Sequence, residues 1–317
     1  SIKYQKYTSI KPNETLIFDL KTRKLLEKKK ICEFDLKQKK DNYDDFVKAL
    51  EKSILKRYPE DSIPLVGVSS GLDSGAISLC LRKHNKPALF ISFPKNEDIN
   101  VLKARQEILK PNHLFLDINP EEKAFWKKDL MDNCEKFTWD FSVSKELWES
   151  KEYHEALWGW RRTRARGMIH NGMDMGSMLA RSKMIAITKQ IEHSEGQKIR
   201  VLYSGIGADE VMAHNSYYDC GWGNVHEFPE DLKDVFPWHN FFGGTMDNYI
   251  KGDEYVGGCY GFETRYPFCD KELIQEFLWL KPELKNDYKG SNYKPPLLYY
   301  LHSHGFPINI RKLGFDP

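Results

Sequence analysis

The pattern of hydrophobic and polar positions predicts a helix followed by alternating strands and helices. Residues 43–58 carry apolar side chains at helical spacing. Four short apolar runs downstream have the length of strands buried on both faces: Ile63–Val68, Ala88–Phe93, Leu114–Ile118 and Arg200–Tyr203. Apolar helical segments lie between them, among them Ala76–Leu81 and Val101–Leu109. This alternation predicts an α/β fold with a doubly wound parallel sheet covered on both faces.

The two ends of the chain differ from this central pattern. Residues 1–60 form a predicted preamble, in which residues 21–40 hold nine Lys or Arg and three acids. A solvated hairpin or linker is the favoured interpretation of that stretch, and an anion-binding patch is the alternative. Residues 121–192 look helical and aromatic, and the part after residue 211 looks helical and loop-rich, with a helix at Lys271–Leu280. We therefore expect one main domain over residues 61–317.

Composition adds limits rather than a function. The 317 residues are 40% hydrophobic and 30% charged, which is typical of a folded globular protein. A net charge of +2 gives no support for nucleic-acid binding, and no apolar run approaches the roughly 18 residues of a membrane span. The six cysteines form no CxxC pair and no zinc spacing. Together with the absence of a signal-peptide core at the polar start, this predicts reduced thiols and a cytoplasmic protein.

The turn Ser69–Ser74 (SSGLDS) follows the first predicted strand and opens a helix. Gly71 and the small serines let a ligand approach the backbone, and the free N–H groups of a helix start favour an anion. A phosphate or pyrophosphate is the natural ligand, and Asp73 would then require a divalent cation such as Mg²⁺. An ordinary helix cap is the competing interpretation.

A second turn, Ser204–Glu210 (SGIGADE), follows the fourth predicted strand and carries Asp209. Ligands of parallel α/β sheets bind at the carboxyl ends of the strands, so both turns are expected in one crevice. Asp73 and Asp209 are thus candidates to share one metal ion, while capping of a helix start is again the alternative.

Together these turns resemble a known family. Ser69–Ser74 resembles the SGGxDS signature of the PP-loop ATP pyrophosphatases, and Ser204–Glu210 resembles the SGxGxDE segment of the asparagine synthetase C-terminal domain family, which includes the β-lactam synthetases. Three further segments fit in the same order: the I-x-P-G-like Ile10–Asn13, the ExRxPFLD-like Glu263–Asp270 and the R-x-K-x-G-F-like Arg311–Phe315.

The resemblance implies a PP-loop fold with a largely helical C-terminal part and an ATP-dependent ligase. Such an enzyme adenylates a carboxylate, releases pyrophosphate and forms an amide with ammonia or an amine. By similarity, Asp73 and Asp209 bind Mg²⁺, Lys312 stabilises the phosphate in the transition state, and Glu263 lies near the nucleophile. The implied ATP-binding residues are Ser69, Ser70, Gly71, Asp73, Ser74, Ser92, Phe93, Gly205 and Gly207, with adenine held by the backbone at Ser92 and Phe93.

Several departures from the family pattern bear on this expectation. Ser70 replaces the first glycine of the motif and fits only with a negative φ. Ile206 stands where relatives have Glu or Tyr, and it cannot accept a proton. The base is then Glu210, or Glu263 alone, unless the nucleophile arrives unprotonated. Arg265 is expected to pair with a buried carboxylate. With no glutaminase-like segment or N-terminal Cys, the amine is expected to be free ammonia, ammonia from another protein, or an amine substrate.

Two other functions remain open from the sequence. One is an ATP-binding subunit or degenerate homologue that partners a separate glutaminase. The other is a PP-loop tRNA-modifying enzyme, and the basic segment 160–166 is the only feature that supports it. The alternative interpretations of this segment are a solvated helix face and a site for an acidic substrate group. Aromatic residues downstream line a substrate pocket or belong to the core: His214, Tyr217, Tyr218, Trp222 and Trp238.

Overall fold

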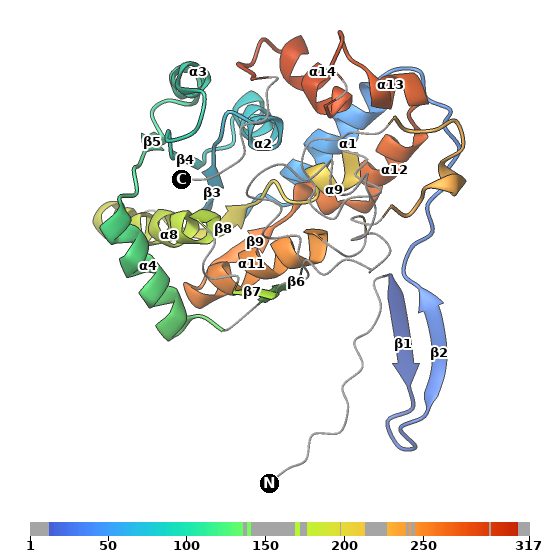
Figure 1. Cartoon of the computed structure of the whole chain (residues 1–317), viewed down its shortest axis with the longest axis horizontal. Coiled ribbons are helices and arrows are strands. Elements are labelled where there is room, and N and C mark those ends of the chain that lie inside the picture. Colours follow the sequence, from blue (N-terminus) through green and yellow to red (C-terminus); the bar gives the residue numbers. More distant parts are fainter. Residues whose placement is uncertain are drawn as a thin grey trace.

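A parallel five-stranded sheet organises the protein (Figure 1). The computed structural model describes residues 13–135, 138–140, 169–171, 176–196, 198–212, 227–238, 241, 245–291 and 293–309. The sheet has the order β5-β4-β3-β8-β9, and every neighbouring pair is parallel. Its strands are β3 (Ile63–Gly67), β4 (Leu89–Ser92), β5 (His113–Phe115), β8 (Ile199–Tyr203) and β9 (Glu263–Arg265).

Helices surround this sheet in the described part of the chain. They are α1 (Asp44–Leu55), α2 (Leu72–Lys83), α3 (Ile99–Leu109), α4 (Pro120–Asn133), α8 (Gly176–Glu195), α9 (Ala208–Met212), α11 (Thr245–Cys259), α12 (Lys271–Trp279), α13 (Pro282–Asn286) and α14 (Pro295–Ser303), with short 3₁₀ turns at Leu232–Asp234 and Pro267–Cys269. None of the described helices is both long and apolar enough to cross a bilayer.

Alternate residues of each central strand enter different hydrophobic cores. In β3, Val66 belongs to the core built with α1, α2, α12 and α14, whereas Leu65 belongs to the core built with α4, α8 and α11. The same division separates Tyr203 from Leu202 in β8. Because successive side chains of a strand point to opposite faces, both faces of the sheet are covered. The predicted α/β class is confirmed, and the arrangement is compatible with a doubly wound sheet.

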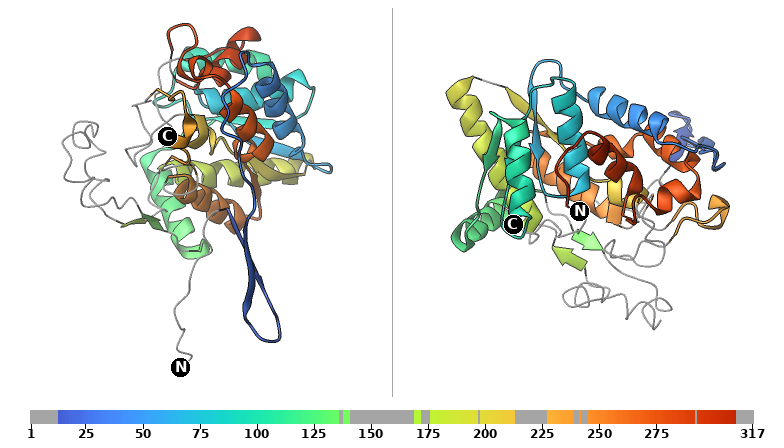
Figure 2. Two further views of the ribbon diagram at one scale, coloured as in Figure 1. Left: turned by 90° about the vertical axis from the view of Figure 1, so that its right-hand side faces the viewer. Right: turned by 90° about the horizontal axis from the view of Figure 1, so that it is seen from above.

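The predicted preamble contains two unlike parts. Strands β1 (Glu14–Phe18) and β2 (Leu25–Lys30) form an antiparallel hairpin that extends away from the body (Figure 2). Helix α1, in contrast, is fully integrated, since Phe46, Leu50 and Ile54 are completely buried in the first core. A second small antiparallel pair is formed by β6 (Thr138–Asp140) and β7 (Ile169–Asn171).

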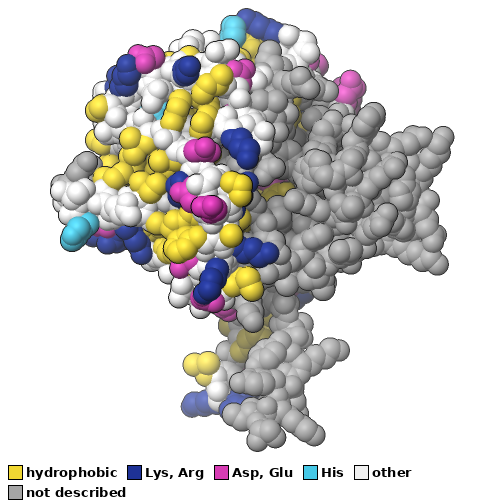
Figure 3. Space-filling view, turned by 60° about the vertical axis from the view of Figure 1, so that its left-hand side comes forward, with side chains coloured by type: hydrophobic (Ala, Val, Ile, Leu, Met, Phe, Trp, Pro, Cys, Tyr) yellow, Lys and Arg dark blue, Asp and Glu magenta, His cyan; other side chains and the backbone are white. Residues whose placement is uncertain are grey.

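The surface agrees with the nearly balanced composition. On the face shown in Figure 3, basic and acidic side chains lie interspersed among hydrophobic ones. Such mixing gives no single-sign field that would steer a polyanion to this face. The described cysteines form no disulfide with one another: Cys32, Cys80, Cys134, Cys259 and Cys269.

Candidate functional site

The strand order puts a switch point at the centre of the sheet. From β3 the chain proceeds through α2 to β4 on one side, while β8 pairs with β3 on the other side and continues to β9. In open α/β sheets, ligands bind at the loops that leave the carboxyl ends of the two strands on either side of such a switch point. Those loops are Ser69–Ser74 and Ser204–Glu210, the two turns singled out by the sequence.

These two turns approach each other closely. A Cβ placed on Gly205 would lie 3.0 Å from the Cβ of Asp73, so a side chain at this position would push the turns apart. Gly207 has a φ of +97°, and a Cβ there would lie 2.7 Å from the Sγ of Cys269. Glycine is thus required at Gly207 for its conformation and for the close approach of the Pro267–Cys269 turn. These two glycines act by admitting neighbouring backbone to the site.

The two candidate metal carboxylates meet at a lysine that the sequence analysis did not select. Lys294 Nζ lies 2.5 Å from Asp73 Oδ1 and 2.9 Å from Asp209 Oδ1, and its side chain is completely buried. Tyr293 adds a hydroxyl that donates to Asp209 Oδ1 at 2.9 Å. Burial lowers the pKa of Lys294, but the negative charges of Asp209 and Asp73 raise it by more than burial lowers it. The pKa of Lys294 therefore lies well above its ordinary value. The lysine is therefore a charged ammonium shared by both aspartates.

The phosphate-type turn is also bonded internally. Ser69 N donates to Ser74 Oγ at 3.0 Å, and Gly71 N donates to Ser69 Oγ at 3.2 Å. Ser70 donates to one carboxylate oxygen of Glu97 twice, through its amide at 2.7 Å and through its hydroxyl. Ser70 keeps a negative φ, as its replacement of glycine requires. An anion bound to this turn would use these same donors. The Glu97 carboxylate already accepts from two of them, the amide and the hydroxyl of Ser70.

Arg105 forms hydrogen bonds with the backbone of this turn. Its guanidinium is completely buried and donates to the carbonyl oxygens of Ser69 and Gly71, while its Nε donates to Pro307 O at 2.9 Å. Within the described residues, its Nη2 has no hydrogen-bond partner. By donating to two carbonyl oxygens of the loop, Arg105 fixes the backbone conformation of the turn.

The predicted adenine-contacting residues are buried at the end of β4. The hydroxyl of Ser92 donates to Val68 O at 2.6 Å and lies 2.7 Å from His113 Nε2. The carbonyl oxygen of Ser92 accepts from Leu116 N, as part of the β4–β5 ladder. Phe93 is 2% exposed and packs in the second core. Ser92 thus has structural partners for both its hydroxyl and its carbonyl, and a ligand would need other groups of this strand end.

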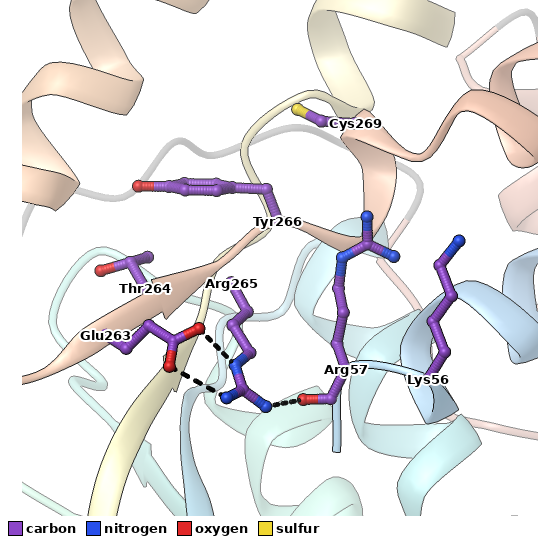
Figure 4. A pocket seen from close by; sticks show the side chains of 7 residues that line it. All are labelled: Lys56, Arg57, Glu263, Thr264, Arg265, Tyr266 and Cys269. Carbon is purple, nitrogen blue, oxygen red and sulfur yellow. Dashed lines mark hydrogen bonds and ion pairs between the residues drawn. The ribbon is translucent and has the colours of Figure 1, made fainter. Parts of the chain in front are cut away.

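Glu263 lies apart from the aspartate pair, on the edge strand β9. Arg265 donates to both of its carboxylate oxygens, at 2.8 and 2.9 Å, and lowers the pKa of Glu263 (Figure 4). These residues line a cavity of about 470 Å³ together with Lys56, Arg57, Thr264, Tyr266 and Cys269. Arg265 therefore pairs with an exposed carboxylate rather than a buried one. A carboxylate held ionised in this way is poorly suited to act as a base.

The other candidate base, Glu210, is buried beside the second turn. Its carboxylate accepts from Gly207 N at 2.9 Å, and burial together with Asp209 raises its pKa. Trp238, a candidate pocket residue, is in the core and donates to Glu210 O at 2.6 Å. The remaining candidates lie outside the described residues: Lys312, His214, Tyr217, Tyr218, Trp222 and the segment 160–166.

The donor set can be tested against the predicted metal. Among the described residues, no group of three or more His, Cys, Asp or Glu side chains could hold a metal ion. Mg²⁺ commonly uses only one or two carboxylates and takes its other ligands from substrate phosphates and water. Asp73 and Asp209 fit this coordination pattern, because a single ammonium contacts both carboxylates and a metal ion at the same place would do so too. In this state, however, Lys294 occupies the oxygens that face each other.

Three residues of this site carried little signal in the sequence. Lys294 precedes Pro295 and Pro296 at the start of α14, in a position that normally favours Ser, Thr, Asp or Asn. A lysine there was the available hint. Glu97 and Arg105 reach the turn from the loop and helix after β4, and only the folded chain reveals their contacts.

Comparison with known proteins adds no relative to this description, since no family model matches the chain and the curated proteins yield no match.

Proposed function

We propose that this chain is an ATP-dependent carboxylate–amine ligase of the PP-loop type, related to the synthetase domain of asparagine synthetases. It would convert a carboxylate and ATP into an acyl-adenylate and pyrophosphate, and then form an amide with ammonia or an amine. The observation that carries the proposal is the convergence of Asp73 and Asp209 on one cation at the switch point of a parallel sheet. The ordered motifs of the sequence supply the choice of reaction.

The residues of the two turns would divide the work. The amides of Ser70 and Gly71, with the serine hydroxyls, would bind phosphate oxygens after their present internal acceptors give way. Asp73 and Asp209 would hold Mg²⁺, which offsets the negative charge on the phosphates when it is bound. Arg105 keeps the loop amides oriented throughout. Lys312 would contribute a further positive charge to the transition state.

An exchange assay tests this function. Wild-type protein is incubated with ATP, Mg²⁺, labelled pyrophosphate and a panel of carboxylates, with and without ammonium. We expect label to enter ATP with at least one carboxylate and no amine, because adenylation is reversible. Asp73→Asn should abolish exchange. Asp61→Asn, which removes an exposed carboxylate paired with Lys198, should retain it.

One observation favours a second candidate, a nucleotide-binding subunit without ligase chemistry. Ile206 cannot accept a proton, and Glu263 is held by Arg265, so neither provides a ready base for an incoming amine. ATP binding without exchange for any carboxylate would favour this candidate and contradict the ligase. Such a subunit would depend on a partner protein for the chemistry.

A further inference from the structure

The contacts of Lys294 carry an inference beyond the predicted ligands. We propose that Lys294 is a positioning residue that holds Asp73 and Asp209 together before metal arrives, and that it competes with the divalent cation for them. The inference rests on the proposed function only in taking these aspartates as the metal ligands. It assigns a role to a residue outside the two motif turns.

Charge and burial give the first argument. Asp73 and Asp209 expose 24% and 22% of their side chains, whereas Lys294 exposes none. Two carboxylates converging at such a site repel each other strongly unless a cation lies between them. The ammonium at 2.5 and 2.9 Å supplies that cation, so the aspartates stay converged without metal. A divalent ion bound to the same oxygens would have to displace it.

The backbone gives an independent argument. Lys294 has a φ of +49°, in the left-handed region that non-glycine residues rarely adopt, and it precedes a proline, which disfavours the helical region for the preceding residue. The surrounding contacts maintain this conformation, since Lys294 O accepts from Leu297 N and Leu298 N at the start of α14. Strain of this kind is often found where a side chain is held in place for function.

Removal of the ammonium should therefore convert the site into a stronger metal site. The variant Lys294→Met keeps the length and apolar stem of the side chain but removes the ammonium from between Asp73 and Asp209. The matched control is Lys285→Met, because Lys285 is equally buried but donates to Gln38 Oε1 and to the carbonyl oxygens of Leu278 and Leu280. Both variants lose one completely buried lysine side chain, and only the first loses it from between two carboxylates.

The test uses Mn²⁺ alone, without nucleotide, and counts free Mn²⁺ by electron paramagnetic resonance. We expect K294M to bind one Mn²⁺ about tenfold or more tightly than wild type, since a competing unit charge has been removed. The melting temperature of K294M should also rise with Mn²⁺ more than that of wild type or K285M. Equal or weaker Mn²⁺ binding by K294M would overturn the inference, whatever the outcome of the exchange assay.

A folding defect in K294M would itself be informative. If this variant does not fold without metal, we expect it to refold with Mn²⁺, and the double variant K294M/D209N to fold without metal because only one carboxylate remains. A K294M chain that stays unfolded at every Mn²⁺ concentration would contradict the inference. In that case the lysine would serve packing of α14 rather than control of the metal site.

Discussion

The contact between the Glu97 carboxylate and Ser70 leads to a quantitative prediction about anion binding. Glu97 accepts both the amide and the hydroxyl of Ser70, so a phosphate oxygen that uses these donors must displace it. Glu97→Gln removes the charge and keeps the shape, which leaves an amide oxygen able to accept from Ser70. We expect the variant to bind pyrophosphate or tripolyphosphate more tightly than wild type.

The size of the effect follows from the charge removed. Two unit charges about 4 Å apart interact by about 4 kcal/mol at an effective dielectric constant of about 20, and by about 2 kcal/mol at twice that separation. The smaller value applies here because Glu97 is only half-buried and would move aside as the anion enters. About 2 kcal/mol corresponds to roughly a 30-fold gain in affinity.

The assay is calorimetric titration of tripolyphosphate without divalent metal at pH 8. Burial raises the pKa of the Glu97 carboxyl, so the titration is made well above the ordinary carboxyl range to favour its ionised form. Glu107→Gln is the matched control, since Glu107 is an exposed residue of α3 whose carboxylate pairs with Lys110. Equal affinities for the E97Q and E107Q variants would refute the reasoning, because general charge would then explain any change.

Three further predictions concern stability, pH and catalysis. Gly207→Ala should lower the free energy of unfolding by about 3 kcal/mol in urea denaturation, because φ is +97° and the new Cβ would collide with Cys269; Gly196→Ala, with φ +70° and open space around it, should cost about 1 kcal/mol. Burial lowers the pKa of His113 from 6.5 to about 4. Between pH 6.5 and pH 4, His113 is therefore protonated in the unfolded chain but neutral in the folded chain. Stability should consequently fall by about 3 kcal/mol as pH drops from 6.5 to 4, and this component should be absent in His113→Gln. Lys312→Ala should reduce kcat in the exchange-competent reaction more than ATP affinity, and an unchanged kcat would remove Lys312 from the mechanism.

Local sequence pattern predicted the central strands because burial on both faces leaves a clear local signature. The apolar run Ile63–Val68 became β3 at Ile63–Gly67, and Ala88–Phe93 became β4 at Leu89–Ser92. The edge strand β9 was not predicted. It has three residues, Glu263 to Arg265, of which only Thr264 is buried, so neither an apolar run nor an alternating pattern marks it. Its pairing with β8 depends on the sheet already being formed.

Prediction of the candidate site from sequence was likewise limited to features that lie within one short segment. The turns at Ser69–Ser74 and Ser204–Glu210 could be located because small residues and carboxylates follow strands in a short window. Lys294 could not, since it lies 221 positions from the aspartate to which it donates. Its contribution is a long-range ion pair, and the spacing of residues in one segment carries no information about such a partner.

Under the proposed function, the two internal contacts of the site favour entry of the metal ion and the polyphosphate as one complex. A polyphosphate alone would displace the Glu97 carboxylate from Ser70 and leave Asp73 and Asp209 facing added negative charge. A divalent cation alone would separate the completely buried Lys294 ammonium from both of its carboxylate partners. A metal–polyphosphate complex avoids both penalties, because its cation replaces the ammonium between the aspartates and its phosphates offer that ammonium new acceptors. Under the proposed function, this arrangement of charges favours a metal-bound nucleotide over either component alone as the ligand of the two turns.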